Sequence, residues 1–202
     1  MISSFAKEGE LVMTEKALAL QADYDLLVDD PSLYCEPASI SRVWANPNVR
    51  IEFEQSADAV QINYEFYDLR RTIPVGDESL MTEYPSTVNV SGTAFDKMGS
   101  SFARYANDRL IIETRNHAPG YIRTSRGVPQ SAQTVSIEVL WMQGERLMLQ
   151  QIYIDETLFE KPFVLDYAFE RIDETVLPLY ECTDANYDWF EKLNAPNVEE
   201  RR

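Results

Sequence analysis

Apolar and polar residues alternate with a period of two through most of the chain from residue 48 to residue 172. Between Val60 and Phe66 every second residue is apolar, and Gln61 and Asn63 stand between them. Because successive side chains of a strand point to opposite faces, this period predicts β-strands with one apolar face. The predicted strands span residues 51–54, 60–66, 69–75, 87–92, 101–105, 109–115, 134–142, 146–155 and 163–172.

Helical spacing of apolar residues occurs only near the two ends of the chain. Thr14 is a suitable N-cap for a helix that extends to Leu27, and Pro31 lies just beyond its end. A second, shorter helix is predicted from Asp184 to Leu193. We expect loops at residues 31–47 and 116–130, and flexible ends at residues 1–13 and 195–202.

The spacing of the strands predicts a single, mainly β domain that covers residues 1–202. Short strands every 8–12 residues, joined by hairpins, are typical of barrels and sandwiches. Residues 110–112 and 139–142 are apolar on both faces, which favours one antiparallel β-barrel, lipocalin-like or calycin-like, with short N- and C-terminal helices. A β-sandwich with an added helix is the alternative.

The charge of the chain narrows the range of partners. Asp and Glu outnumber Lys and Arg by 34 to 18, which gives a formal net charge of −16. Such a surface repels phosphate backbones and anionic headgroups, so we expect neither nucleic-acid binding nor membrane docking. No apolar run approaches the length of a transmembrane helix. The charge leaves homo-oligomerisation open.

Two cysteines, Cys35 and Cys182, lie near opposite ends of the predicted domain. They form either a disulfide that joins the two ends or two buried thiols, and a disulfide indicates an oxidising compartment. Residues 1–20 lack the layout of a signal peptide. The protein is therefore either cytoplasmic, or periplasmic or secreted after removal of a signal, in which case Met1 is not the native start.

Four segments resemble a family of mostly secreted bacterial proteins. The family pattern runs C-x-P-x-G-x-P-R, Y-E-x-x-x-x-R-R-I, G-H-S-x-G-R-W-E-G-D-T-L-V-V-E-T and Y-x-C. The matching segments here are residues 35–42, 64–73, 99–114 and 180–182. The resemblance implies secretion and pairing of the two cysteines, but no activity. Ser100 replaces the histidine of the third segment, and Ser39 and Ser41 replace a glycine and a proline of the first.

The residue types exclude several kinds of chemistry. His117 is the only histidine, and the two cysteines are far apart, so we expect no zinc site. The motifs for nucleotide phosphates, dinucleotides and EF-hand calcium are also missing, and we predict neither a metal nor a cofactor. A Ser-His-Asp triad would need His117, which we instead expect to be exposed or locally hydrogen-bonded in a loop.

The densest group of charged and aromatic residues is the stretch 64–71. Glu65 and Tyr67 share one face of the predicted strand, and Arg70 and Arg71 point to opposite faces. If the first face lines a barrel lumen, Glu65, Tyr67 and one of the two arginines, assigned as Arg70, form a catalytic group, with Glu65 as general acid or base. If it faces solvent, Glu65 is an ordinary surface residue and the arginine forms a structural ion pair.

Other strand residues are candidates for ligand binding. Arg104 and Glu113 are expected to pair across the hairpin that turns at Asn107. Together with these two residues, we expect Arg71, Tyr105, Trp141 and Tyr153 to line a pocket. The sequence therefore predicts binding of a small, partly apolar molecule. The alternative is a cofactor-free lyase, isomerase or hydrolase that uses a pocket carboxylate.

Overall fold

The computed structural model describes residues 1–47, 49–173 and 176–183, and the side chains of residues 3–5 are not described. A six-stranded antiparallel sheet forms one side of the molecule, in the order β1-β12-β11-β10-β7-β6. Its strands are β1 (Ile2–Glu8), β6 (Ser100–Ala106), β7 (Arg109–Arg115), β10 (Val135–Gln143), β11 (Arg146–Ile154) and β12 (Phe163–Glu170).

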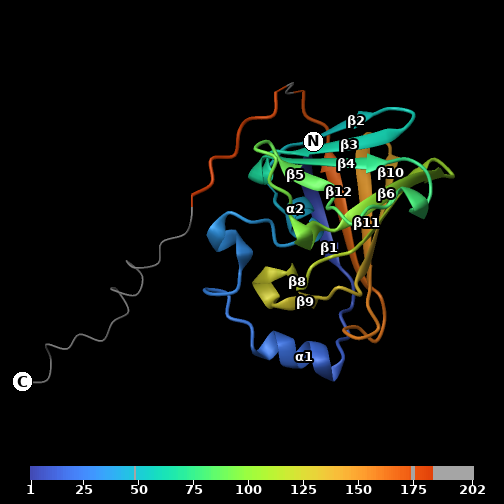
Figure 1. Ribbon diagram of the computed structural model, residues 1–202. Helices are drawn as coiled ribbons and strands as arrows, with labels where there is room; N and C mark the ends of the chain where they lie inside the picture. The colour runs from blue at the N-terminus through green and yellow to red at the C-terminus, as the bar shows by residue number, and fades with distance from the viewer. Residues whose placement is uncertain (48, 174–175, 184–202) are drawn as a thin grey trace, which may run out of the picture.

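A four-stranded antiparallel sheet, in the order β2-β3-β4-β5, packs against the first sheet (Figure 1). Its strands are β2 (Ile51–Gln55), β3 (Ala59–Tyr64), β4 (Leu69–Pro74) and β5 (Thr87–Asn89). A separate hairpin of β8 (Gly120–Arg123) and β9 (Val128–Gln130) lies with helix α1 (Glu15–Ala22) at the opposite end of the molecule from Met1 (Figure 1). The prediction of a mainly β, antiparallel fold is therefore confirmed.

The two large sheets meet at two short seams. At one seam, Met1 and Ile51 exchange backbone hydrogen bonds of 2.7 and 2.9 Å. At the other, the backbone N–H of Gly76 donates to Ala103 at 2.8 Å, next to a single parallel bridge between Val75 and Ala103.

The described strands therefore form separate sheets, and the predicted closed barrel is not found. One cause of the incomplete closure is visible at the edge of β4 that does not pair with β3. Residues 69–71 of this edge pair with β5, and the backbone N–H of Thr72 donates to Ser86. Each backbone edge of a strand pairs with one neighbour. Strand β6 can therefore bond this edge only after β4 ends at Pro74, at Val75 and Gly76.

Helix α2 (Ile40–Trp44) contributes to the core between the sheets. The Ser39 hydroxyl accepts a hydrogen bond from the backbone of Arg42, which caps the helix, and donates to the carbonyl of Ile122 in β8. Trp44 is fully buried, with ring centroids 5.3 Å from Tyr64 and 6.0 Å from Phe53. A helix this short depends on such packing for its stability. Its residues were expected to be loop, so this part of the prediction is wrong.

Helix α1 begins as predicted but ends early. The Thr14 hydroxyl accepts from the backbone N–H of Ala17, and the helix stops at Ala22 instead of Leu27. The Asp25 carboxylate bonds the backbone N–H of Leu27, which stabilises a turn instead of a further helical turn. The expected helical continuation is therefore wrong.

Two further expectations, for residues 2–8 and 116–130, are wrong, and two others concern residues outside the described part of the chain. Residues 2–8, expected to be flexible, form β1 along β12. Residues 116–130, expected to be loop, contain the β8–β9 hairpin. The predicted helix at 184–193 and the flexible end at 195–202 lie outside the described residues. In the part of the chain that is described, no helix is both long and apolar enough to span a bilayer.

The predicted disulfide is confirmed. Cys35 and Cys182 are bonded, with Cα atoms 5.9 Å apart and 147 residues between them in sequence. The bond ties the segment after β12 back to the turn that precedes α2. Next to it, the rings of Phe66, Tyr67 and Tyr180 pack together at 4.1–5.4 Å between centroids.

Candidate functional site

Two adjoining pockets lie at the end of the molecule that carries Met1. We call them the charged pocket, of about 410 Å³, and the apolar pocket, of about 390 Å³. Met1, Phe53 and Met142 line both, so the two pockets form one site, which we call the open-end site. Its size lies in the range of pockets that bind small molecules.

The apolar pocket lies between β2 and two hairpins of the six-stranded sheet. Phe53 is on the inward face of β2, opposite Ile62 of β3, because it alternates with Glu52 and Glu54. From the other side the pocket is lined mainly by apolar residues of the β6–β7 and β10–β11 hairpins: Tyr105, Leu110, Leu140, Trp141, Met142 and Leu147. Met142 remains 61% exposed at the mouth.

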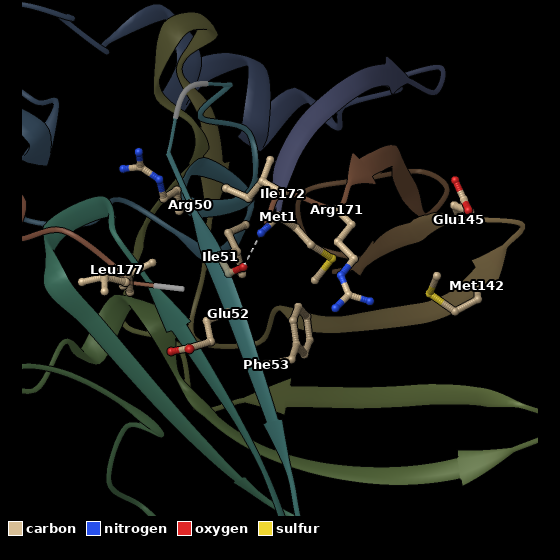
Figure 2. A pocket seen from close by; sticks show the side chains of 11 residues that line it. Met1, Arg50, Ile51, Glu52, Phe53, Met142, Glu145, Arg171, Ile172 and Leu177 are labelled. Atoms are coloured by element: carbon tan, nitrogen blue, oxygen red, sulfur yellow. Dashed lines mark hydrogen bonds between the residues drawn. The ribbon is translucent and has the colours of Figure 1, made fainter. Parts of the chain in front are cut away.

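The charged pocket extends from Phe53 towards the segment after β12. Figure 2 shows Arg171 with its guanidinium directed between Phe53 and Met142, beside the side chain of Met1. Arg50 points away from them, and its guanidinium lies 3.3 Å from a carboxylate oxygen of Glu65. The pocket is completed by Ile51, Glu52, Glu145, Ile172, Val176 and Leu177.

A fully buried ion pair lies one layer deeper than the apolar pocket. Arg71 of β4 donates to a carboxylate oxygen of Glu138 of β10 at 2.6 Å, and both side chains are fully inaccessible to solvent. The same guanidinium nitrogen bonds the hydroxyls of Ser101 and Thr114, at 3.0 and 2.9 Å. The second oxygen of Glu138 accepts from the indole N–H of Trp44 at 2.6 Å. We call these five residues the buried cluster.

The register of the six-stranded sheet explains why polar side chains gather there. Glu138 lies opposite Gln151, and Ser136 lies opposite both Tyr153 and Thr114. These residues form two neighbouring rows on the inward face. Leu140, the next inward residue of β10, already lines the apolar pocket. Same-face neighbours along a strand are about 7 Å apart, so the buried cluster lies directly beneath the pocket.

Electrostatics keep Arg71 charged. Burial alone would lower its pKa, but the adjacent Glu138 carboxylate raises the pKa above its ordinary value. Burial also raises the pKa of the Tyr64 and Tyr153 hydroxyls, which stay protonated. The buried cluster therefore carries one positive and one negative charge, whose mutual attraction compensates for the loss of water.

The structure separates the residues that were expected to act together with Glu65. Strand β3 ends at Tyr64, and its inward face carries Val60 and Ile62, so the face of Glu65 is not the interior. Glu65 lies at the start of a turn and pairs with Arg50. The expectation that Glu65 lies in a barrel lumen is therefore wrong. Glu65 is not the ordinary surface residue of the alternative either, because it is mostly buried in its pair with Arg50.

The remaining residues of that stretch also diverge. Tyr67 packs against Phe66 and Tyr180, and burial raises its pKa to about 12. Arg70 lies on the outer face, where it donates to the carbonyl of Leu69 at 2.8 Å. Arg71 is the arginine that enters the interior, so the assignment of Arg70 to an interior catalytic group is wrong.

The expected ligand-binding residues fall into three places. Tyr105 and Trp141 line the apolar pocket, and the Trp141 ring lies 4.9 Å from the Arg109 guanidinium. Arg104 and Glu113 pair at 4.0 Å on the outer face, as predicted, away from the pocket. Tyr153 is fully buried near the buried cluster and does not line either pocket of the open-end site.

His117 is locally bonded but not exposed. Its Nδ1 lies 3.2 Å from the carbonyl of Lys97, and its Nε2 lies 3.4 Å from the Ser136 hydroxyl. Burial lowers its pKa to about 4. Both members of this Ser-His pair are buried, at 0% and 2% exposure, so no substrate reaches the serine in this conformation.

Sequence reasoning missed several residues of the site. Phe53, Leu140 and Leu147 are ordinary strand residues, and Arg171 lies at the predicted end of the last strand; none carries a local signal. The segments with the motif pattern supply three residues of the buried cluster. Arg71 from the second, and Ser101 and Thr114 from the third, meet in the buried cluster.

Within the described residues, no group of three or more His, Cys, Asp or Glu side chains is placed to hold a metal ion. Comparisons with protein-family models, with curated proteins and with solved structures find no match to this chain.

Proposed function

We propose that this protein binds a small, partly apolar molecule in the open-end site. The observation that carries the proposal is the joining of two pockets of about 400 Å³ each, one mainly apolar and one charged, through Met1, Phe53 and Met142. Ligand sites typically combine apolar walls with a few polar groups that fix orientation. The apolar walls bury the body of the ligand, and the charged pocket holds its polar end.

We also propose a barrel type for the fold and a cellular location for the protein. The two sheets and their short seams act as a flattened, incompletely closed barrel of the lipocalin type, which carries the site at one end. The described Cys35–Cys182 disulfide and the family resemblance support a periplasmic or secreted protein. Trp44 and the buried cluster fill the space between the two sheets, and the open-end site lies at the end of this space.

A second candidate is cofactor-free acid–base chemistry in a lyase, isomerase or hydrolase. It is favoured by the position of Glu138, a fully buried carboxylate beside Arg71 and Tyr64. Both oxygens of Glu138 already accept short hydrogen bonds, and its side chain is inaccessible. A substrate would have to displace Trp44 or Arg71 to reach it. We therefore place binding before catalysis.

Native mass spectrometry tests the proposal with a matched pair of variants. Met142→Glu introduces a charge at the residue shared by both pockets, where the native side chain is 61% exposed. Val90→Glu introduces the same charge at a 53% exposed residue that lines neither pocket. Both changes leave the core intact, so stability is expected to change by less than about 0.5 kcal/mol.

We expect the wild type and Val90→Glu to retain a co-purified small molecule, or added 1-octanol after extraction, and Met142→Glu to lose it. Equal retention by the two variants would place the ligand elsewhere. Failure of the extracted wild type to bind 1-octanol and octanoate up to their solubility would contradict the proposed function.

A further inference from the structure

We infer that the ligand carries one anionic group, which Arg171 binds, while its apolar chain enters the apolar pocket. This inference rests on the proposed function and specifies the chemical class of the ligand, an amphipathic monoanion. The arginine that binds the polar end of the ligand is then Arg171, in the segment that follows β12, and not an arginine of the stretch 64–71.

The position of Arg171 is the first observation. It is the residue after the last residue of β12, Glu170, so the strand delivers its side chain to the rim of the site. Figure 2 shows the guanidinium directed into the pocket, above Phe53 and beside Met142. A planar, always charged guanidinium at this place presents several donors to a carboxylate.

The second observation concerns charge. Two arginines near Arg171 have acidic partners: Arg50 pairs with Glu65 at 3.3 Å and Arg146 pairs with Glu170 at 3.1 Å. Arg109, among the described residues, has no ion pair and lies 4.9 Å from the Trp141 ring. Among the described residues, no carboxylate lies within 4.0 Å of Arg171, although acidic residues outnumber basic ones by 34 to 18. Arg171 differs from Arg109 in that its guanidinium is directed into a pocket (Figure 2), where its donors can bind an external anion.

The acidic residues of the charged pocket do not compete for Arg171. Glu52 accepts a hydrogen bond from the side-chain amide of Asn63 at 3.0 Å. Figure 2 shows Glu145 at the hairpin turn, with its carboxylate pointing away from Arg171. Among the described residues, neither carboxylate forms an ion pair with Arg171, so its guanidinium can bind a ligand carboxylate.

The apolar pocket determines the other half of the ligand. It shares Phe53 and Met142 with the charged pocket, so a molecule bound at Arg171 can continue past these two residues towards Leu140 and Leu147. Each methylene buried there is expected to raise affinity about fourfold. A linear carboxylate of medium length satisfies both halves of the site.

Isothermal titration calorimetry with octanoate and 1-octanol tests the inference, because the two probes share their chain and differ in charge. The variants are Arg171→Gln and, as a matched control, Arg146→Gln. The control removes the same charge from an arginine of the neighbouring strand β11 that lines neither pocket.

We expect Arg171→Gln to weaken octanoate binding about tenfold, since one charge-assisted contact at a partly exposed site is lost. Its affinity for 1-octanol is expected to stay within twofold, and Arg146→Gln is expected to leave both probes unchanged. Equal octanoate affinity in the wild type and Arg171→Gln, with 1-octanol still bound, would overturn the inference alone. Binding of neither probe to the wild type would overturn the proposed function as well.

Discussion

Glu138→Leu is expected to destabilise the protein strongly, because it leaves the Arg71 guanidinium buried without its counter-charge. Breaking a buried ion pair by removing one partner typically costs about 3–5 kcal/mol. The indole N–H of Trp44 also loses its acceptor, which adds about 1–3 kcal/mol. The sum approaches the whole stability of an ordinary domain, so Glu138→Leu is expected to be largely unfolded.

Arg71→Met is expected to cost about 3–5 kcal/mol for the same reason, since Glu138 is then left as an unpaired buried anion. The loss of hydrogen bonds to its two hydroxyl partners adds less to this cost. Ser101 and Thr114 lie 2.9 Å apart and can still bond each other when the guanidinium is gone. The two single changes together therefore account for about 7–13 kcal/mol if they act independently.

The double variant Arg71→Met/Glu138→Leu removes both charges and fills the space with apolar atoms. Replacing a buried ion pair by hydrophobic residues is often neutral or stabilising. Only the N–H of Trp44 then remains without its acceptor, at about 1–3 kcal/mol. The double variant is thus expected to be more stable than either single one, with a coupling energy of several kcal/mol.

Urea denaturation of the oxidised proteins, followed by circular dichroism, measures the four free energies of unfolding. If the single variants do not fold, recovery of a cooperative transition in the double variant is the predicted signature of coupling. A double variant destabilised by the full sum of the single effects would refute the assignment of Arg71 and Glu138 as mutually compensating charges.

Three further predictions concern the interior and the disulfide. The pKa of His117 is about 4 in the folded protein and ordinarily 6.5, so the unfolded chain alone takes up this proton between pH 6.5 and pH 4. The contribution of His117 to the free energy of unfolding is fully present above pH 6.5 and falls by about 3 kcal/mol towards pH 4. The difference in stability between the wild type and His117→Gln should therefore narrow by that amount over this pH range. A constant difference would contradict the lowered pKa of His117. Gln151→Leu is expected to raise the free energy of unfolding by about 1–3 kcal/mol, because Gln151 is fully buried and neither polar atom of its side chain bonds a described residue; a loss of stability in urea would contradict this. Cys35→Ser/Cys182→Ser is expected to lose up to about 5 kcal/mol, as judged from the 147-residue separation, and an unchanged urea midpoint would argue against the bond.

Local alternation predicted most of the strands, because each strand of a two-sided sheet leaves a two-residue period in the sequence. Strand β7 has the predicted bounds of residues 109–115, and the expected pairing of Arg104 with Glu113 is present. Strand β1 had no such signal. Its residues pair with β12, more than 150 positions away, and their order lacks strict alternation.

The direction of the faces was harder to predict than the strands themselves. In β10, Ile137 and Val139 alternate with Ser136 and Glu138, so hydrophobicity alone would put the two apolar residues inside. The structure instead buries Ser136 and Glu138 completely, because Arg71 and Trp44 bond Glu138 and His117 bonds Ser136, each from a different part of the chain. Such long-range compensation leaves no local pattern.

The stretch 64–71 shows the same limit for the site. Its density of charge suggested one functional group, but a turn after Tyr64 sends its members in different directions. Arg71 goes into the buried cluster, whereas Glu65 pairs with Arg50 outside it. The open-end site draws on residues 53, 142 and 171, whose proximity follows from how the two sheets meet.

Methyl-selective NMR on protein labelled at the methionine methyl groups tests the central claim most directly. Among the methionines, Met1 and Met142 line the open-end site, whereas Met98 is fully buried and lines neither pocket. Titration with octanoate is expected to shift the Met142 and Met1 signals progressively and to leave Met98 unchanged. Unchanged Met142 and Met1 signals at saturating octanoate would contradict the assignment of the open-end site as a ligand site.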